Sequence, residues 1–218
     1  MKLNPKYWNS VIATNVLQFI FIFSSVYFAF WLTERRATKE LENVEALAIE
    51  AITKELRSNL IELEKSQIYH DALVRNLQYL YDSLKEYPDR IGENSLMDLF
   101  SAQVERNGNT IAFPFISRVS WDSFKQSQAF MVMDYELSNV INKHFRLQEL
   151  GVESTALKMR DFFFSNEMYE ERVQLAQLLR LIYLFQEING QEIYLINSTK
   201  MTIELLAKNY DQIEETES

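Results

Sequence analysis

The chain opens with a long run of apolar positions and continues with apolar positions at helical spacing. Residues 11–32 contain no charged residue and no histidine, and they are rich in Phe, Ile, Val and Leu. About 20 such residues are enough for a helix to cross the hydrocarbon core of a bilayer. Tyr7 and Trp8 stand before this run and Tyr27 and Trp31 near its end, and aromatic residues of this kind favour the two membrane interfaces. The pattern predicts a transmembrane helix over residues 11–32.

Two other interpretations of this segment are a buried core helix and a cleaved signal peptide. A core helix rarely runs this long without a charge. The candidate cleavage position follows Ala29, but bulky Tyr27 stands two residues before that alanine, and cleavage requires small residues at both places. We therefore expect an uncleaved anchor that follows a short tail, residues 1–10, and contacts the lipid bilayer through residues 11–32.

The next segment, residues 33–87, predicts one long helix that continues from the transmembrane helix. It contains no Gly or Pro, and its apolar residues repeat every seven positions in two columns, as in a coiled-coil seam. The first column holds Ile49, Leu56, Leu63, His70, Leu77 and Leu84, and the second holds Ile52, Asn59, Ser66, Leu73 and Leu80. Pro88 ends the helix, because proline cannot continue the pattern of backbone hydrogen bonds.

The residues that follow predict several short helices. Ser95 and Asp98 fit a capping box at the start of the first. Residues 107–109, Asn-Gly-Asn, are a turn signal. Ser120 is placed to cap a further short helix.

Helices resume at Asp134 and are expected to stop at Gly151, after which Ser154 is a candidate cap for another helix. A second long helix is predicted over residues 166–214, followed by an acidic tail at residues 215–218.

The second long helix also follows a heptad, with Asn189 in one column and Glu192 in the other. The heptad keeps its phase across Gly190, which indicates one continuous helix. The pair Asn189-Gly190 also fits a turn between two helices, and the sequence leaves that alternative open.

Together these elements predict an all-α protein. The simplest arrangement packs the two long helices, 33–87 and 166–214, as an antiparallel pair with its open ends toward the membrane. Residues 88–165 then form a small helical cap far from the bilayer.

Composition narrows the class of protein. The 218 residues include 4 Gly, 3 Pro and no Cys, which favours long helices and excludes disulfides, Cys-ligated zinc and thiol catalysis. The net charge is −9, and Glu34 is the only acidic residue before residue 40. The part after the anchor is therefore acidic and repels nucleic acid and anionic lipid headgroups.

The search for enzyme motifs gives exclusions. No two glycines lie within 15 residues of one another, whereas a P-loop, a dinucleotide fingerprint and a nucleophile elbow need closely spaced glycines. The two histidines, His70 and His144, lack the spacing of zinc and di-iron motifs. We expect no enzyme activity, no catalytic residue, no metal and no cofactor, although a serine triad that meets only in the fold escapes this search.

Polar residues in the heptad columns are the candidate functional positions. Asn59, Ser66, His70 and Asn189 would set the register of two packed helices by facing one another. The alternative is that they line a ligand cleft. Trp121 is expected in the core of the cap, or as part of an exposed docking patch.

Three stretches, residues 30–36, 52–59 and 121–127 followed by Asp134-Tyr135-Glu136-Leu137, resemble an uncharacterised bacterial family of small single-pass membrane-anchored helical proteins, a domain of unknown function. Gln126 and Gln128 depart from the family pattern, which has Ser and Gly there. The resemblance implies a protein of the bacterial inner membrane, with a cytoplasmic amino terminus and residues 33–218 in the periplasm. It implies no activity and no catalytic residue.

Two functions remain in view. The heptads favour a membrane-anchored helical scaffold or interaction module that binds a partner protein or forms a homo-oligomer. The polar column residues favour, as the alternative, an extracytoplasmic sensory or ligand-binding module that acts through a partner. Lys and Arg are nearly balanced across the anchor, so the positive-inside rule does not choose its orientation.

Overall fold

The computed structural model describes residues 5–90, 94–106, 113–170 and 173–217, with side chains at 15–89, 94–105, 113–170 and 173–208. Within these ranges every regular element is helical. The α-helices are α1 (Pro5–Glu86), α2 (Leu96–Arg106), α3 (Val119–Phe124), α4 (Tyr135–Gln148), α5 (Ser154–Phe163) and α6 (Leu175–Glu217). Short 3-10 turns are η1 (Pro88–Arg90), η2 (Gln128–Met131) and η4 (Asn166–Met168), and η3 (Glu149–Glu153) is a π-helical turn. The prediction of an all-α protein is confirmed.

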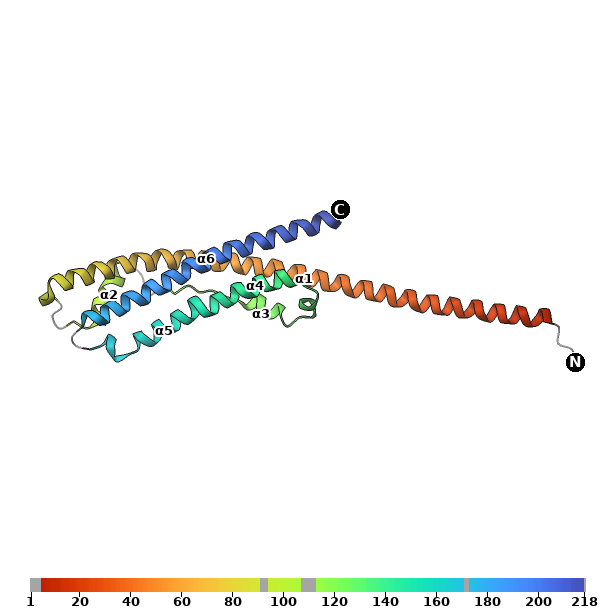
Figure 1. Ribbon diagram of the computed structural model, residues 1–218, viewed down its shortest axis with the longest axis horizontal. Helices are drawn as coiled ribbons and strands as arrows, with labels where there is room; N and C mark the ends of the chain where they lie inside the picture. Colours follow the sequence, from red (N-terminus) through yellow and green to blue (C-terminus); the bar gives the residue numbers. More distant parts are fainter. Residues whose placement is uncertain (1–4, 91–93, 107–112, 171–172, 218) are drawn as a thin grey trace.

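α1 runs the whole length of the molecule and projects beyond the bundle at its N-terminal end (Figure 1). Its 82 residues correspond to roughly 120 Å at 1.5 Å per residue. No Gly or Pro interrupts it, and it ends at Glu86 because Pro88 follows. The predicted continuation of the apolar helix into a long second segment is therefore confirmed.

α6 lies alongside α1 (Figure 1) and makes most of its contacts with that helix. Lys200 contacts Glu64 with an Nζ–Oε1 distance of 2.7 Å, and Gln67 donates to Asn189. α6 begins at Leu175, later than predicted, and passes through Gly190 without a break. The interpretation of Asn189-Gly190 as a turn is wrong.

Two hydrophobic clusters fill the bundle. The larger one joins α1, α2, α5 and α6 around Phe100, Phe163 and Phe185. The other packs Trp121, Phe124, Ala129, Met133, Leu137, Ile141 and Phe145 against Ile49, Ile52 and Leu56 of α1 and Leu206 of α6.

The second cluster shows that the expected position of the cap, at the far end of the long helices, is wrong for residues 119–145. Residues 119–145 pack beside the part of α1 that holds Ile49, Ile52 and Leu56, nearer the projecting segment, and not at the far end. The reason is that this part of the α1 stripe is apolar and α6 alone does not cover it, so α3, η2 and α4 complete its burial.

Local signals were correct where the chain caps itself. The Ser95 backbone N–H donates to Asp98 Oδ2 at 3.0 Å, and the Asp98 N–H donates to Ser95 Oγ at 3.1 Å, which confirms the capping box. The turn predicted at 107–109 lies outside the described residues.

Three other local predictions are wrong. Arg118, not Ser120, occupies the position before α3. The chain does not stop at Gly151, because η3 joins α4 to α5 in helical conformation, and Ser154 therefore has no helix start to cap. A Cβ on Gly151 would lie 2.7 Å from Gln191 Oε1, so the glycine lets α6 approach closely.

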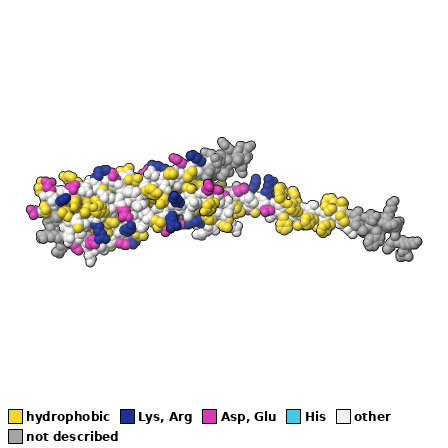
Figure 2. Space-filling view, in the orientation of Figure 1, with side chains coloured by type: hydrophobic (Ala, Val, Ile, Leu, Met, Phe, Trp, Pro, Cys, Tyr) yellow, Lys and Arg dark blue, Asp and Glu magenta, His cyan; other side chains and the backbone are white. Residues whose placement is uncertain are grey.

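The projecting part of α1 is an exposed apolar segment, called here the bare segment. Its large apolar side chains between residues 16 and 32 are all exposed, from Leu32 at 37% to Phe30 at 72%, and Figure 2 shows them as a hydrophobic band beyond the mixed polar surface of the bundle. By length and composition α1 contains one segment apolar enough to cross a membrane.

Candidate functional site

Three buried polar side chains meet between α1 and α6. Ser66 and His70 are one helical turn apart on α1, and Glu192 comes from α6. Ser66 Oγ donates to Glu192 Oε1 at 2.6 Å, and His70 Nδ1 lies 3.0 Å from both Glu192 oxygens. The exposed fraction is 0% for His70 and Glu192 and 3% for Ser66.

His70 Nδ1 faces the Glu192 carboxyl group. An ionised carboxylate only accepts hydrogen bonds, so this nitrogen is the donor when Glu192 is ionised. The other nitrogen, Nε2, is buried without a hydrogen-bond partner among the described residues. It lies in aromatic surroundings, since the rings of Tyr69, Phe113 and Phe185 are centred 5.7, 6.0 and 5.6 Å from the His70 ring.

This cluster does not have the arrangement of a serine triad. In a triad the carboxylate and the serine bind opposite nitrogens of the imidazole. Here Ser66 Oγ lies 3.4 Å from Nδ1, the same nitrogen that faces Glu192. All three side chains are enclosed by the bundle, and the arrangement joins two helices at one register by buried hydrogen bonds.

Asn59 joins α1 to the chain before α3. Its Nδ2 donates to the Ser117 carbonyl oxygen at 2.7 Å, and its Oδ1 accepts from the Ser117 N–H at 2.9 Å. One turn earlier, Glu55 accepts from the Ser117 hydroxyl and from the backbone N–H groups of Val119 and Ser120, each at 2.9 Å. Glu55 thus satisfies the free N–H groups at the start of α3 that Ser120 was expected to cap.

Asn189 and Trp121 take two different positions. Asn189 Oδ1 accepts a hydrogen bond from Gln67 Nε2 at 3.1 Å across the α1–α6 contact. Trp121 is 1% exposed and stacks on Phe145, with ring centroids 6.3 Å apart. It therefore belongs to the core, and the alternative of an exposed docking patch at this residue is wrong.

His144 on α4 is one of the residues that line a groove of about 290 Å³ between α4 and α6. Its Nδ1 lies 3.0 Å from Ser198 Oγ. Burial lowers the pKa of His144 from 6.5 to about 4, because the bundle does not solvate a charged imidazolium. His144 is therefore neutral at pH 7.

A second groove, of about 280 Å³, lies beside Trp121 and is lined by acidic and basic side chains that form ion pairs. Arg118 pairs with Glu149 at 2.9 Å and Lys125 with Asp122 at 2.8 Å. A third groove, of about 550 Å³, lies between α1 and α6 near Leu206. Asn59, Ser66, His70 and Asn189 line none of these three grooves. Among the described residues no group of three His, Asp or Glu side chains is arranged to hold a metal ion.

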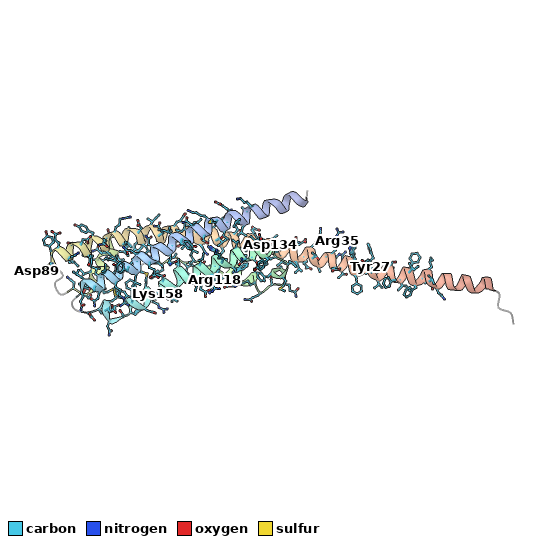
Figure 3. The ribbon with its side chains drawn as sticks, viewed as in Figure 1. Tyr27, Arg35, Asp89, Arg118, Asp134 and Lys158 are labelled. Carbon is cyan, nitrogen blue, oxygen red and sulfur yellow. The ribbon has the colours of Figure 1, made fainter. Side chains whose placement is uncertain are left out.

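Charged residues mark the junction between the bare segment and the bundle (Figure 3). The Arg35 guanidinium lies over the Trp31 ring, 5.0 Å from its centroid. Asp134 caps α4 by accepting from the Leu137 N–H at 2.8 Å. Burial raises the pKa of Glu45, and the charges of Glu42 and Asp134 add to this effect.

Sequence reasoning singled out Ser66 and His70 but not their partner Glu192. The available signal was that Glu192 occupies an apolar column of the second long helix, as Ser66 and His70 do in the first. Glu55 gave no signal, because its partners, the Ser117 hydroxyl and the backbone N–H groups of Val119 and Ser120, lie about sixty residues later in the chain. Comparison of the chain with protein-family models, with curated proteins and with solved structures finds no match.

Proposed function

We propose that this protein is a membrane-anchored helical scaffold or interaction module without catalytic activity of its own. The observation that carries the proposal is the exposed apolar segment of α1, residues 16–32, which continues without a break into the helical bundle. The segment would fix the bundle to a bilayer, and the unbroken α1 would hold it at a defined height and orientation.

The exposure of the segment supports the bilayer as its surroundings. Phe19, Phe21, Ile22 and Phe30 are 65–72% exposed in the isolated chain, and each such side chain gains roughly 1.5–3 kcal/mol when it leaves water for an apolar medium. Trp31 under Arg35 marks one interface, since both side chains place a polar group at headgroup level.

The polar contacts inside the bundle support a scaffold. Asn59, Ser66, His70 and Asn189 act as register residues in this proposal, because each has its partner on another part of the chain. They would fix α1 and α6 as an antiparallel pair. The three grooves described above are lined by other residues, which favours the scaffold over the ligand-binding module.

For topology we propose a single pass through a bacterial inner membrane, with the amino terminus in the cytoplasm and residues 33–218 in the periplasm. This orientation rests on the family resemblance alone.

The natural lack of Cys allows a direct test. Two single-Cys variants, Lys2→Cys before the apolar segment and Asp161→Cys in the bundle, are expressed in bacterial cells. The Asp161 side chain is 71% exposed. Intact and lysed cells are treated with a membrane-impermeant maleimide, and membranes are extracted with alkaline carbonate.

The proposal expects both variants to remain in carbonate-washed membranes, with Asp161→Cys labelled in intact cells and Lys2→Cys labelled only after lysis. The reverse labelling pattern would overturn the orientation but keep the anchor. Release of the chain by carbonate would overturn the anchor and with it the proposed function.

A further inference from the structure

We propose that a second copy of this chain docks along the outer face of α1, so that two α1 helices pair in parallel over residues 44–79. This inference rests on the membrane anchoring proposed above and names the partner of the scaffold.

The outer face of α1 carries an exposed apolar stripe. Its large members are Val44, Leu47, Ile61, Ile68 and Tyr79, with exposed fractions of 42, 66, 54, 68 and 77%. Val44 and Tyr79 belong to one column of a heptad, and Leu47, Ile61 and Ile68 belong to the other. This stripe is separate from the columns that face α6, because those residues are buried. Two heptad faces on one helix indicate two packing partners, and the fold supplies one of them.

Small residues stand between the large ones. Ala51, Ser58 and Ala72 occupy the same column as Val44 and Tyr79, and small side chains let two helix backbones approach closely. Three basic residues also stand in the two columns: Lys65 in that of Val44 and Tyr79, and Lys54 and Arg75 in that of Leu47. Their long apolar stems would cover the stripe while the charged groups turn outward to water.

Membrane anchoring selects a second copy with parallel orientation. Two copies inserted the same way carry their stripes at the same height, so Leu47 meets Leu47 and Ile61 meets Ile61 about a two-fold axis. Arg57 then lies beside Glu62 of the other copy, a complementary pair at the flanking heptad positions, where Glu62 also pairs with Lys65 of its own helix at 3.0 Å. Glu50 and Glu55 would meet with like charge, but Glu55 already accepts hydrogen bonds from the start of α3.

Cysteine cross-linking of the full chain in native membranes tests this pairing. Ile61→Cys places a thiol on the stripe, and Tyr183→Cys places one on α6 at a similar exposure, 54% against 59%. With copper phenanthroline as oxidant, the proposal expects a disulfide-linked dimer for Ile61→Cys and monomer for Tyr183→Cys. Equal cross-linking of both variants, no dimer from Ile61→Cys, or a cross-link to a different protein would overturn it.

A charge variant gives an independent measurement. Ile61→Glu with Ile68→Glu should raise the dimer dissociation constant in detergent roughly 100-fold or more, because four carboxylates would enter an apolar interface. Light scattering after size exclusion measures it, with Tyr183→Glu as the control that stays dimeric. A wild-type monomer, or a dimer that survives the double change, would overturn the pairing. Retention in carbonate-washed membranes would show in either case that the anchor itself stands.

Discussion

At the residue scale, Glu192 of α6 is bonded to the buried Ser66 and His70 side chains of α1. Its change to Leu would leave Ser66 and His70 without the carboxyl group to which both are bonded. Loss of a buried hydrogen-bond partner costs roughly 1–3 kcal/mol for each group that it leaves unsatisfied, so we expect a clear fall in the thermal unfolding temperature. Circular dichroism of the full chain in detergent measures it.

Two comparisons separate this effect from a general effect of substitution. Lys200→Ala removes an exposed ion pair with Glu64 and should cost less than about 1 kcal/mol. The triple change Ser66→Ala, His70→Leu and Glu192→Leu should recover most of the loss, because it replaces all three polar side chains of the cluster with apolar ones. If Glu192→Leu alone is neutral, the cluster does not hold the two helices in register.

His144 predicts a pH dependence of stability. Its pKa is about 4 in the folded chain and about 6.5 when unfolded. Between these values the unfolded chain binds a proton that the folded chain does not, so the unfolding free energy falls as the pH falls from 6.5 to 4. The loss is at most about 3 kcal/mol.

Because carboxylates also titrate in this range, the measured quantity is the difference between wild type and His144→Gln. That difference should change between pH 7 and pH 4, with the variant losing less stability than wild type. Parallel curves for the two proteins would argue against a buried neutral histidine.

At the element scale, sequence was a good guide where the cause of a structure is local. The lack of Gly and Pro between residues 6 and 87 gave the length of α1, and Ser95 with Asp98 gave the start of α2. The break expected at Gly151 was wrong because its cause is tertiary: Gln191 of α6 packs against that position. A sequence does not show that neighbour.

The two glycines inside helices make opposite predictions. A Cβ at Gly190 meets nothing within 4 Å, so Gly190→Ala should stabilise the chain by about 0.5–1 kcal/mol through lower backbone entropy in the unfolded state. Gly151→Ala meets Gln191 Oε1 at 2.7 Å and should gain less or destabilise. Thermal unfolding of both variants measures the order, and a more stable Gly151→Ala would contradict this packing.

At the scale of the whole molecule, sequence separated the apolar segment from the rest but placed residues 119–145 at the wrong end. The segment was visible because an uncharged run of this length is its own signal. The packing of Trp121 and Phe124 against Ile49 and Ile52 was not visible. Apolar side chains can pack against any apolar helix face of suitable size, so the sequence does not specify which face they cover.

Because the apolar segment and the bundle are separate, the bundle should keep its stability without the segment. The large apolar side chains between residues 16 and 32 are all exposed, and both core clusters lie entirely after residue 40. Deletion of residues 1–33 should therefore release the chain from membranes while its thermal unfolding temperature in the same detergent changes by less than about 2 °C, since less than about 1 kcal/mol of packing is lost. Membrane fractionation and circular dichroism measure the two quantities. A large fall in the unfolding temperature would mean that the segment stabilises the fold as well as anchoring it, through contacts with a second copy of α1.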